Sequence, residues 1–205
     1  MSQLPRDFFS ACLKGLLGFL ALGAWSGSMV QAHTVPNLTV EADFALDGSA
    51  KIQVNLDPRL FLADDPTTLP PIPADWIRNM GAEERAKIDQ QASAYLEQAL
   101  AWRFGEDAAP MVMTWSFLAI DGGTGGELSD ETVEVHLLAQ TQIEVPAAEG
   151  KFCVAVLEGA KAAMVLLNRL GEQAERRAQV LFPGETSRPF QCRPEEKAST
   201  SAAGS

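Results

Sequence analysis

Residues 38–56 read LTVEADFALDGSAKIQVNL, and this stretch decides the fold class of the chain. Apolar and polar side chains alternate along it on both sides of Asp47-Gly48, a dipeptide that favours a tight two-residue turn. An alternation with period two places the apolar side chains on one face of a β-strand and the polar ones on the other. The stretch therefore predicts a β-hairpin with one buried face and one polar face.

Strand patterns recur further along the chain, at residues 112–120, 132–144, 152–157, 162–167 and 179–182. The run 132–144 alternates most regularly, and because it is long for a single strand we expect a bend in it. The last two segments read as an antiparallel pair. The apolar run 162–170 also fits a helix, because its apolar residues do not show whether they repeat every two positions, as in a strand, or every three to four, as in a helix. The glycine-rich residues 122–126 lie between two strand segments, and we interpret them as a flexible hairpin loop.

One segment has the pattern of a long helix. Residues 83–104 contain no Gly or Pro, and their apolar side chains recur every three or four positions. The Pro-rich residues 64–75 before it read as an extended surface connection, since proline interrupts both helices and central strands. Many short strands and one helix together predict a mainly β fold: an antiparallel β-sandwich with one inserted amphipathic helix at about residues 83–104.

The first 32 residues have the pattern of a secretory signal peptide. A basic start precedes an apolar run at residues 15–25, and Val30-Gln31-Ala32 supplies the small residues that a signal peptidase reads. The apolar run has about 11 residues, whereas a membrane-spanning helix needs about 20. We therefore predict cleavage after Ala32, an extracytoplasmic location (periplasmic or secreted), and a mature chain without a transmembrane segment.

Three regions follow from these patterns: the signal peptide at 1–32, a single domain at 33–192 and a disordered polar tail at 193–205. Without residues 1–32 the chain has 173 residues and a formal net charge of −12. Because so acidic a protein is repelled by phosphate backbones and anionic lipid headgroups, we expect neither nucleic acid nor a membrane surface as a partner. A small cationic ligand, a metal ion or a basic partner protein remains open.

Two cysteines remain after the predicted cleavage. An exported pair lies outside the reducing cytosol, so Cys153 and Cys192 form a candidate disulfide. The alternative is a buried Cys153 that packs as a small apolar residue, with a separate thiol at Cys192 near the tail. The sequence leaves both alternatives open.

The chain carries none of the catalytic or phosphate-binding motifs G-x-S-x-G, G-x-x-x-x-G-K, C-x-x-C or H-E-x-x-H. Its histidines are His33 and His136, and no activated serine stands out beside them. We therefore expect no enzymatic activity, and interpret the chain as an exported, soluble binding or adaptor domain of unknown ligand.

A copper site is the alternative. The predicted cleavage makes His33 the first residue, whose α-amine and imidazole can bind one metal ion together. Cu(II) favours a tetragonal set of nitrogen and oxygen ligands. His136 lies on the polar face of its predicted strand, where we expect it to be accessible, and would supply a third nitrogen. Glu134, Glu41 or Asp43 could supply an axial oxygen.

Two resemblances accompany this alternative. A mature N-terminal His33 with His136 on a β-sandwich resembles small periplasmic copper carriers and copper-dependent polysaccharide oxidases, which implies copper as the cofactor. The start Ala32-His33-x-x-Pro36 resembles the extracytoplasmic heads of hydrogenase and urease accessory membrane proteins, whose transmembrane part has no counterpart in this sequence.

Overall fold

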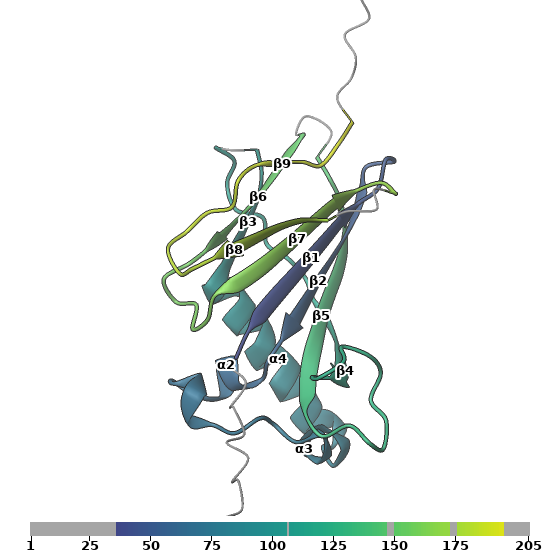
Figure 1. Cartoon of the computed structure of the whole chain (residues 1–205), viewed down its shortest axis with the longest axis vertical. Coiled ribbons are helices and arrows are strands. Elements are labelled where there is room, and N and C mark those ends of the chain that lie inside the picture. Colours follow the sequence, from purple (N-terminus) through teal and green to yellow (C-terminus); the bar gives the residue numbers. More distant parts are fainter. Residues whose placement is uncertain (1–35, 106, 147–149, 173–175, 195–205) are drawn as a thin grey trace, which may run out of the picture. The chain divides into compact units, whose positions relative to one another are not determined.

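The computed structural model of the chain describes residues 36–105, 107–146, 150–172 and 176–194 (Figure 1). The structure is mainly β, with 40% strand, 20% helix and two sheets. By its internal contacts the chain separates into residues 1–33 and residues 34–205. The first unit lies outside the described residues, and with it the predicted signal peptide and His33.

The larger sheet has six strands in the order β4-β5-β2-β1-β7-β8. Its strands are β1 (Leu38–Phe44), β2 (Ser49–Leu56), β4 (Ser116–Asp121), β5 (Val135–Glu144), β7 (Met164–Leu170) and β8 (Arg177–Leu181). β1 and β2 pair antiparallel, with Leu38 opposite Leu56, which confirms the predicted hairpin. β7 and β8 also pair antiparallel, so the apolar run 162–170 is mostly strand and not helix.

The larger sheet is mixed, so the expectation of an antiparallel sandwich throughout is wrong. β1 pairs with β7 in parallel, with Leu38 opposite Met164 and Phe44 opposite Leu170. A parallel pair needs a long crossover between its strands. The chain between β1 and β7 provides one, since it contains the longest helix and two strands of the second sheet.

The second sheet contains β3 (Leu100–Phe104), β6 (Lys151–Val156) and β9 (Phe190–Gln191), in that order. Aromatic rings join it to the larger sheet. The ring centroid of Phe44 in β1 lies 5.0 Å from that of Phe152 in β6 and 5.6 Å from that of Phe190 in β9. Aromatic pairs at such separations contribute about 0.5–1.5 kcal/mol beyond the area that they bury.

The helical segments between β2 and β3 are α2 (Arg59–Leu62), the 3-10 turn η1 (Pro66–Thr68), α3 (Ala74–Arg78) and α4 (Ala82–Ala99). α4 begins after Gly81, whose amide donates to the Glu84 carboxylate at 3.2 Å. Within the described residues, no helix is both long and apolar enough to cross a membrane.

The predicted helix at 83–104 ends five residues early, because Leu100–Phe104 form β3. Four of these five side chains are buried, so both faces of the strand are covered. An apolar run of this kind does not reveal its period in the sequence. Trp102, expected on the apolar stripe of the helix, therefore lies in a sheet, opposite Val154 of β6.

The expected extended connection at 64–75 contains η1 and leads into α3. Both segments use proline where a helix tolerates it, at the start: Pro66 is the first residue of η1, and Pro73 immediately precedes α3. Ile77 of α3 is buried and anchors this connection in the core.

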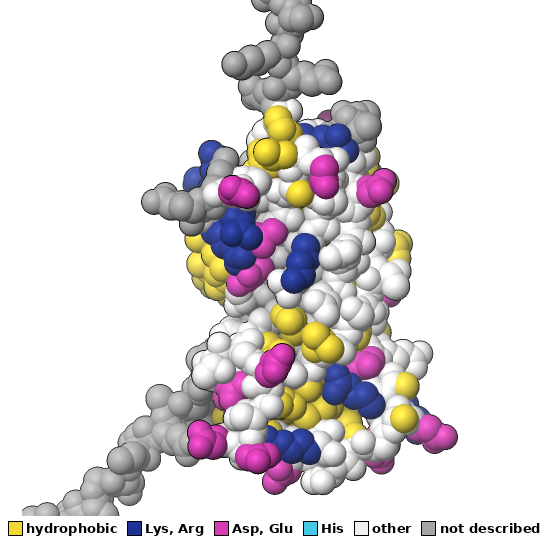
Figure 2. Space-filling view, turned by 90° about the vertical axis from the view of Figure 1, so that its right-hand side faces the viewer, with side chains coloured by type: hydrophobic (Ala, Val, Ile, Leu, Met, Phe, Trp, Pro, Cys, Tyr) yellow, Lys and Arg dark blue, Asp and Glu magenta, His cyan; other side chains and the backbone are white. Residues whose placement is uncertain are grey.

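One face of the larger sheet is covered and the other is open. In Figure 1, α4 and the second sheet lie behind the larger sheet. The core residues of β1 are Leu38, Val40, Ala42 and Phe44. Between them Thr39, Glu41 and Asp43 are only half-buried and lie on the opposite, open face. Figure 2, turned by 90°, shows basic and acidic side chains interspersed on the side that it presents.

Asn168 of β7 is a polar side chain on the covered face. It is 1% exposed, and neither its amide nitrogen nor its amide oxygen has a hydrogen-bond partner in the described part of the chain. An unpaired buried polar group costs about 1–3 kcal/mol. We predict that Asn168→Leu, a change to an apolar side chain of similar size, raises the free energy of unfolding by about 1 kcal/mol in a urea titration.

Asn79→Leu is the control for this prediction, because Asn79 is exposed just after α3. It should change the free energy of unfolding by less than about 0.5 kcal/mol. A stability of Asn168→Leu at or below that of the unmodified protein would contradict the prediction.

Candidate functional site

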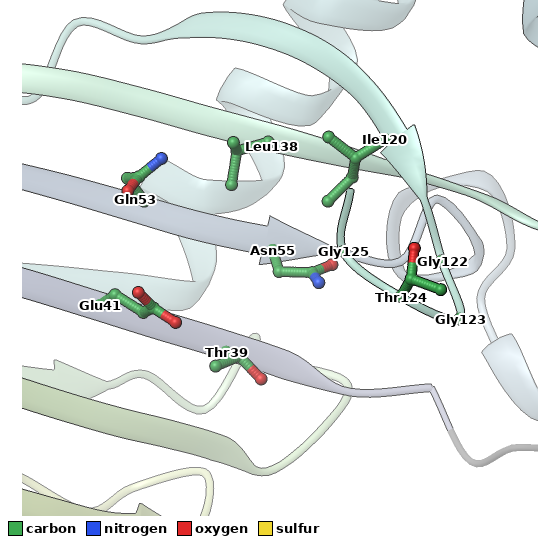
Figure 3. Close-up of a pocket in the computed structure, with 10 residues that line it drawn as sticks. All are labelled: Thr39, Glu41, Gln53, Asn55, Ile120, Gly122, Gly123, Thr124, Gly125 and Leu138. Carbon is green, nitrogen blue, oxygen red and sulfur yellow. The ribbon is translucent and has the colours of Figure 1, made fainter. Parts of the chain in front are cut away.

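The open face of the larger sheet carries a cavity of about 420 Å³ (Figure 3). Its lining residues are Thr39, Glu41, Gln53, Asn55, Ile120, Gly122, Gly123, Thr124, Gly125 and Leu138. They come from β1, β2, β4, β5 and the loop that joins β4 to β5. The volume lies within the range of small-molecule sites, roughly 300–1,000 Å³.

Strand pairing brings the polar side chains of this cavity together. Thr39 lies opposite Asn55 and Glu41 lies opposite Gln53 in the β1–β2 hairpin. On the other side of β2, Leu138 of β5 lies opposite Asn55. Opposed residues of neighbouring strands project to the same face, with Cβ atoms about 4.5–5.5 Å apart. The hairpin pattern in the sequence therefore accounts for most of the floor of the cavity.

The loop Asp121–Gly126, which forms one wall, is closed by its own hydrogen bonds. The Asp121 carboxylate accepts the amides of Thr124 at 2.8 Å and Gly123 at 2.9 Å. The Thr124 hydroxyl accepts the Gly126 amide at 3.2 Å. The backbone amides of Gly122 and Gly125 donate to backbone carbonyls. Hydrogen bonds, that from the Thr124 amide foremost, hold the pKa of Asp121 below its ordinary value. The loop amides are thus engaged within the protein.

A group of charged side chains adjoins the cavity at Asn55. His136 of β5 directs its Nδ1 to Asn55 Oδ1 at 2.7 Å. Its Nε2 faces Glu134 Oε1 at 3.4 Å and Asp57 Oδ2 at 3.8 Å. Arg59 binds that same Asp57 oxygen, through Nη2 at 2.6 Å and Nε at 2.9 Å. We call Asp57, Arg59, Glu134 and His136 the charged cluster.

The charged cluster forms where β2 ends. Asp57 is the first residue after the strand, and its carboxylate also accepts the backbone amide of Arg59 at 2.9 Å, where α2 begins. Both side chains are almost fully buried. Burial of a lone charge costs several kcal/mol, and a doubly hydrogen-bonded guanidinium–carboxylate pair offsets that cost. Each of the two side chains therefore depends on the other.

The loop meets the charged cluster at Gly122. A Cβ atom added there would lie 2.8 Å from His136 Cδ2 and 2.9 Å from Glu134 Cγ, closer than real Cβ contacts come. Glycine therefore lets the loop backbone pack directly on the imidazole. This contact helps to bury His136, which is 6% exposed, so the expectation that His136 is accessible is wrong.

A second set of charges lies beside the cavity at Glu41. Arg176 donates to Glu41 and, at 3.0 Å, to Asp43. Arg169 donates to the same Asp43 oxygen at 2.9 Å. The neighbouring Glu41 carboxylate raises the pKa of Arg176 above its ordinary value. Glu41 and Asp43 thus bind arginine side chains. Neither belongs to the group of possible metal ligands around His136 in the described residues.

The structure brings together only part of the predicted copper site. His136 and Glu134 lie side by side, whereas His33 lies outside the described residues. Asp57 joins them, since these three side chains offer ligand atoms within 4.8 Å of one another. The Arg59 guanidinium already neutralises Asp57 and lies 3.8 Å from Glu134. Only Glu134 and the buried His136 would then be left as metal ligands in this group, fewer than the roughly three or four protein ligands of a zinc site.

Cys153 is buried in β6, and Cys192 is buried directly after the neighbouring strand β9. Lys151 pairs with Gln191, and the Cys192 amide donates to the Gly150 carbonyl at 2.8 Å. Cys153 and Cys192 are therefore offset by three residues across one strand spacing, about 11 Å between Cα atoms. A disulfide spans less than roughly 7 Å. No disulfide is present among the described residues, and the register does not support the predicted one.

The sequence patterns do not single out Asn55, Asp57 and Arg59 as site residues. In the sequence Asp57-Pro58 marks only the end of a strand, and an arginine that follows reads as a solvated side chain. The usable signal is the spacing: an aspartate two residues before an arginine can accept its amide and pair with its guanidinium. Asn55 carries no such signal, because its role depends on the ring of a residue 81 positions away.

No known protein family matches the chain, and no curated protein matches it either. The resemblances to copper proteins and to hydrogenase and urease accessory proteins therefore rest on the N-terminal sequence and the two histidines.

The buried ion pair generates a stability prediction. Arg59→Met should lower the free energy of unfolding by about 3–5 kcal/mol, because it leaves the Asp57 carboxylate buried without its guanidinium. The double variant Asp57→Leu/Arg59→Met should recover most of that loss, since it removes both charges. Urea denaturation measures all three proteins.

Arg85→Met is the matched control, because Arg85 pairs with Asp89 at 2.9 Å on the more exposed surface of α4. Its loss should cost at most about 0.5 kcal/mol. Equal losses in Arg59→Met and Arg85→Met would show that the buried pair contributes no more than the surface pair.

Proposed function

We propose that this chain is an exported, soluble binding domain without enzymatic activity, and that its ligand lies in the cavity on the open sheet face. The observation that supports this proposal is the cavity. Binding sites are concave and have a few convergent polar groups, and here Thr39, Gln53 and Asn55 converge beside Glu41. The ten lining residues include no Ser, Cys or His. Thr39, Gln53 and Asn55 offer hydrogen-bonding groups to a ligand.

Export and architecture are part of the same proposal. Residues 1–32 act as a cleaved signal peptide, and 33–192 form one β-sandwich-like domain. Of the predicted tail at 193–205, Arg193 donates to the Val145 carbonyl, and residues 195–205 lie outside the described residues. The contacts of Phe44 with Phe152 and Phe190 support a sandwich. Packed sheets meet through inward side chains of this kind, with the sheets about 10 Å apart.

Thermal unfolding with a panel of small neutral, cationic and anionic compounds tests the cavity. A ligand at 100 times its Kd stabilises a protein by about 2.7 kcal/mol, which raises the Tm of a domain of this size by about 5–10 °C. We predict such a shift with at least one compound for the mature chain. Gln53→Ala should reduce the shift by about a quarter to a half, because the variant removes a hydrogen-bonding side chain from the cavity floor and weakens binding about three- to tenfold.

Gln142→Ala is the matched control. Gln142 lies opposite Lys51 on the same open face but outside the cavity lining. This variant should keep the full shift. Equal losses in the two variants would assign the ligand to another place, and an unchanged Tm with every compound would reject the cavity as a binding site.

We propose copper binding as the second candidate function. The position of Leu38, the first residue of β1, supports it. Leu38 lies opposite Leu56, and Leu56 lies opposite Leu137, the neighbour of His136. Two strand spacings amount to about 10 Å. The five residues from His33 to Leu38 span up to about 17 Å when extended. The length of chain therefore allows His33 to reach His136.

The proposed copper site has four donor atoms: two from His33, one from His136 and one from Glu134. The α-amine and imidazole of His33 and the Nε2 of His136 would hold the copper ion, and Glu134 would supply an oxygen ligand. These four donors form the nitrogen and oxygen set that Cu(II) favours. A copper carrier is the role that we propose for this site, with a copper-dependent oxidase as the alternative.

Three purified forms test the copper site: the mature chain that begins at His33, the same chain with one extra N-terminal residue, and the mature His136→Ala variant. We predict tight Cu(II) binding in calorimetry for the first form alone, because the extra residue converts the α-amine into an amide. Binding that survives the extra residue but not His136→Ala would assign copper to the charged cluster alone. Equal binding by all three forms would place the metal elsewhere.

A further inference from the structure

The distribution of charge around the open-face cavity limits what it can bind. We infer that its ligand is an uncharged polyhydroxyl compound of the sugar or sugar-alcohol class, an inference that rests on the proposed binding function. Three properties of the cavity support it. The loop amides are already hydrogen-bonded within the protein, Glu41 is ion-paired, and the other polar side chains that line the cavity are neutral.

An anionic ligand would find no counter-charge among the lining residues, and the adjacent Arg176 guanidinium is already paired with Glu41 and Asp43. The ten lining residues include no Lys, Arg or His. Backbone amides of glycine-rich loops can bind anions, but here Asp121, Thr124 and backbone carbonyls already accept them. The Asp121 carboxylate itself repels an anion. A bound phosphate or carboxylate would lose its hydration without an opposite charge to compensate for it.

A cationic ligand would compete with an arginine. Glu41 is the one carboxylate among the lining residues, and it forms an ion pair with Arg176. Arg176 is held in place by a second contact, to Asp43 at 3.0 Å. A ligand cation beside Glu41 would therefore meet the guanidinium charge. The acidic net charge of the chain acts at a distance, where salt screens it.

The remaining polar groups suit hydroxyls, which both donate and accept hydrogen bonds. The side chains of Thr39 and Gln53 do both, and neither is hydrogen-bonded to another side chain in the described part of the structure. Asn55 is oriented by His136, which holds its Oδ1 at 2.7 Å and leaves its Nδ2 as a donor. His136 is thus a positioning residue for the cavity.

The cavity also has an apolar side. Figure 3 shows Ile120 and Leu138 beside each other, with Gln53, Asn55, Glu41 and Thr39 along the neighbouring strands. A sugar ring presents both kinds of surface, hydroxyl edges and a C–H face. An ion or a wholly apolar compound would leave one side of the cavity unmatched.

Sugars that share one ring and differ at a single charged or neutral substituent test this inference. Glucose, glucosamine and glucuronate form one matched series, and galactose, galactosamine and galacturonate form the other. Binding to the mature chain is followed by proton–nitrogen NMR at about pH 6, through the side-chain amide signals of Gln53 and Asn55. We expect at least one neutral sugar to shift both signals, and its charged analogues to bind at least about tenfold more weakly.

Two further measurements define the expected result. The Kd of the neutral sugar should change by less than about twofold between low and high salt, because no charge pair is screened. Gln53→Ala should weaken binding about three- to tenfold, through the lost hydrogen bonds, whereas Gln142→Ala should leave the Kd within about twofold.

A charged analogue that binds as tightly as its neutral sugar would overturn the inference, and so would the failure of all six sugars to shift the amide signals. The proposed function fails separately. If a compound of another class raises the Tm, and Gln53→Ala reduces that shift while Gln142→Ala does not, the cavity remains a binding site and only the ligand class is wrong.

Discussion

The packing of Phe44 against Phe152 and Phe190 is the contact on which the arrangement of this protein depends. It ties the central strand β1 to the second sheet on one face only. Every second residue of β1 and β2 is drawn into that core, and the residues between them are left on the other face. The polar cavity follows from this one-sided packing, because its floor is the set of residues that the core does not use.

The charged cluster needs a different explanation. A buried ion pair is weak evidence for stability, since well-packed apolar side chains often serve a fold as well or better. The Arg59–Asp57 pair instead has a positional effect. It fixes the end of β2 against the start of α2, and it sets the surroundings of His136 Nε2. His136 in turn holds Asn55. A chain of short contacts therefore runs from a helix start to the cavity.

The sequence predicts the local part of this structure well and the long-range part poorly. The hairpin at 38–56 is recognisable because alternation is a local property, whereas the apolar run at 162–170 fits a helix as well as the strand that it forms. The parallel β1–β7 pair is not recognisable, since it joins segments separated by more than 100 residues. The strand at 100–104 is also hidden, because burial on both faces erases the alternation that would distinguish it from a helix.

The same distinction applies to the site. Alternation places His136 on the open face, but it cannot show that a glycine loop packs over the ring. The two proposed functions meet at this residue. In the proposed copper site His136 Nε2 would hold the metal, and metal-binding histidines commonly donate their other ring N–H to an oxygen. Asn55 Oδ1, 2.7 Å from Nδ1, is such an acceptor. The contact that orients the cavity donor would therefore also orient a copper ligand. The two functions separate at Gln53, which belongs to the cavity alone, and at His33, which belongs to the proposed copper site alone.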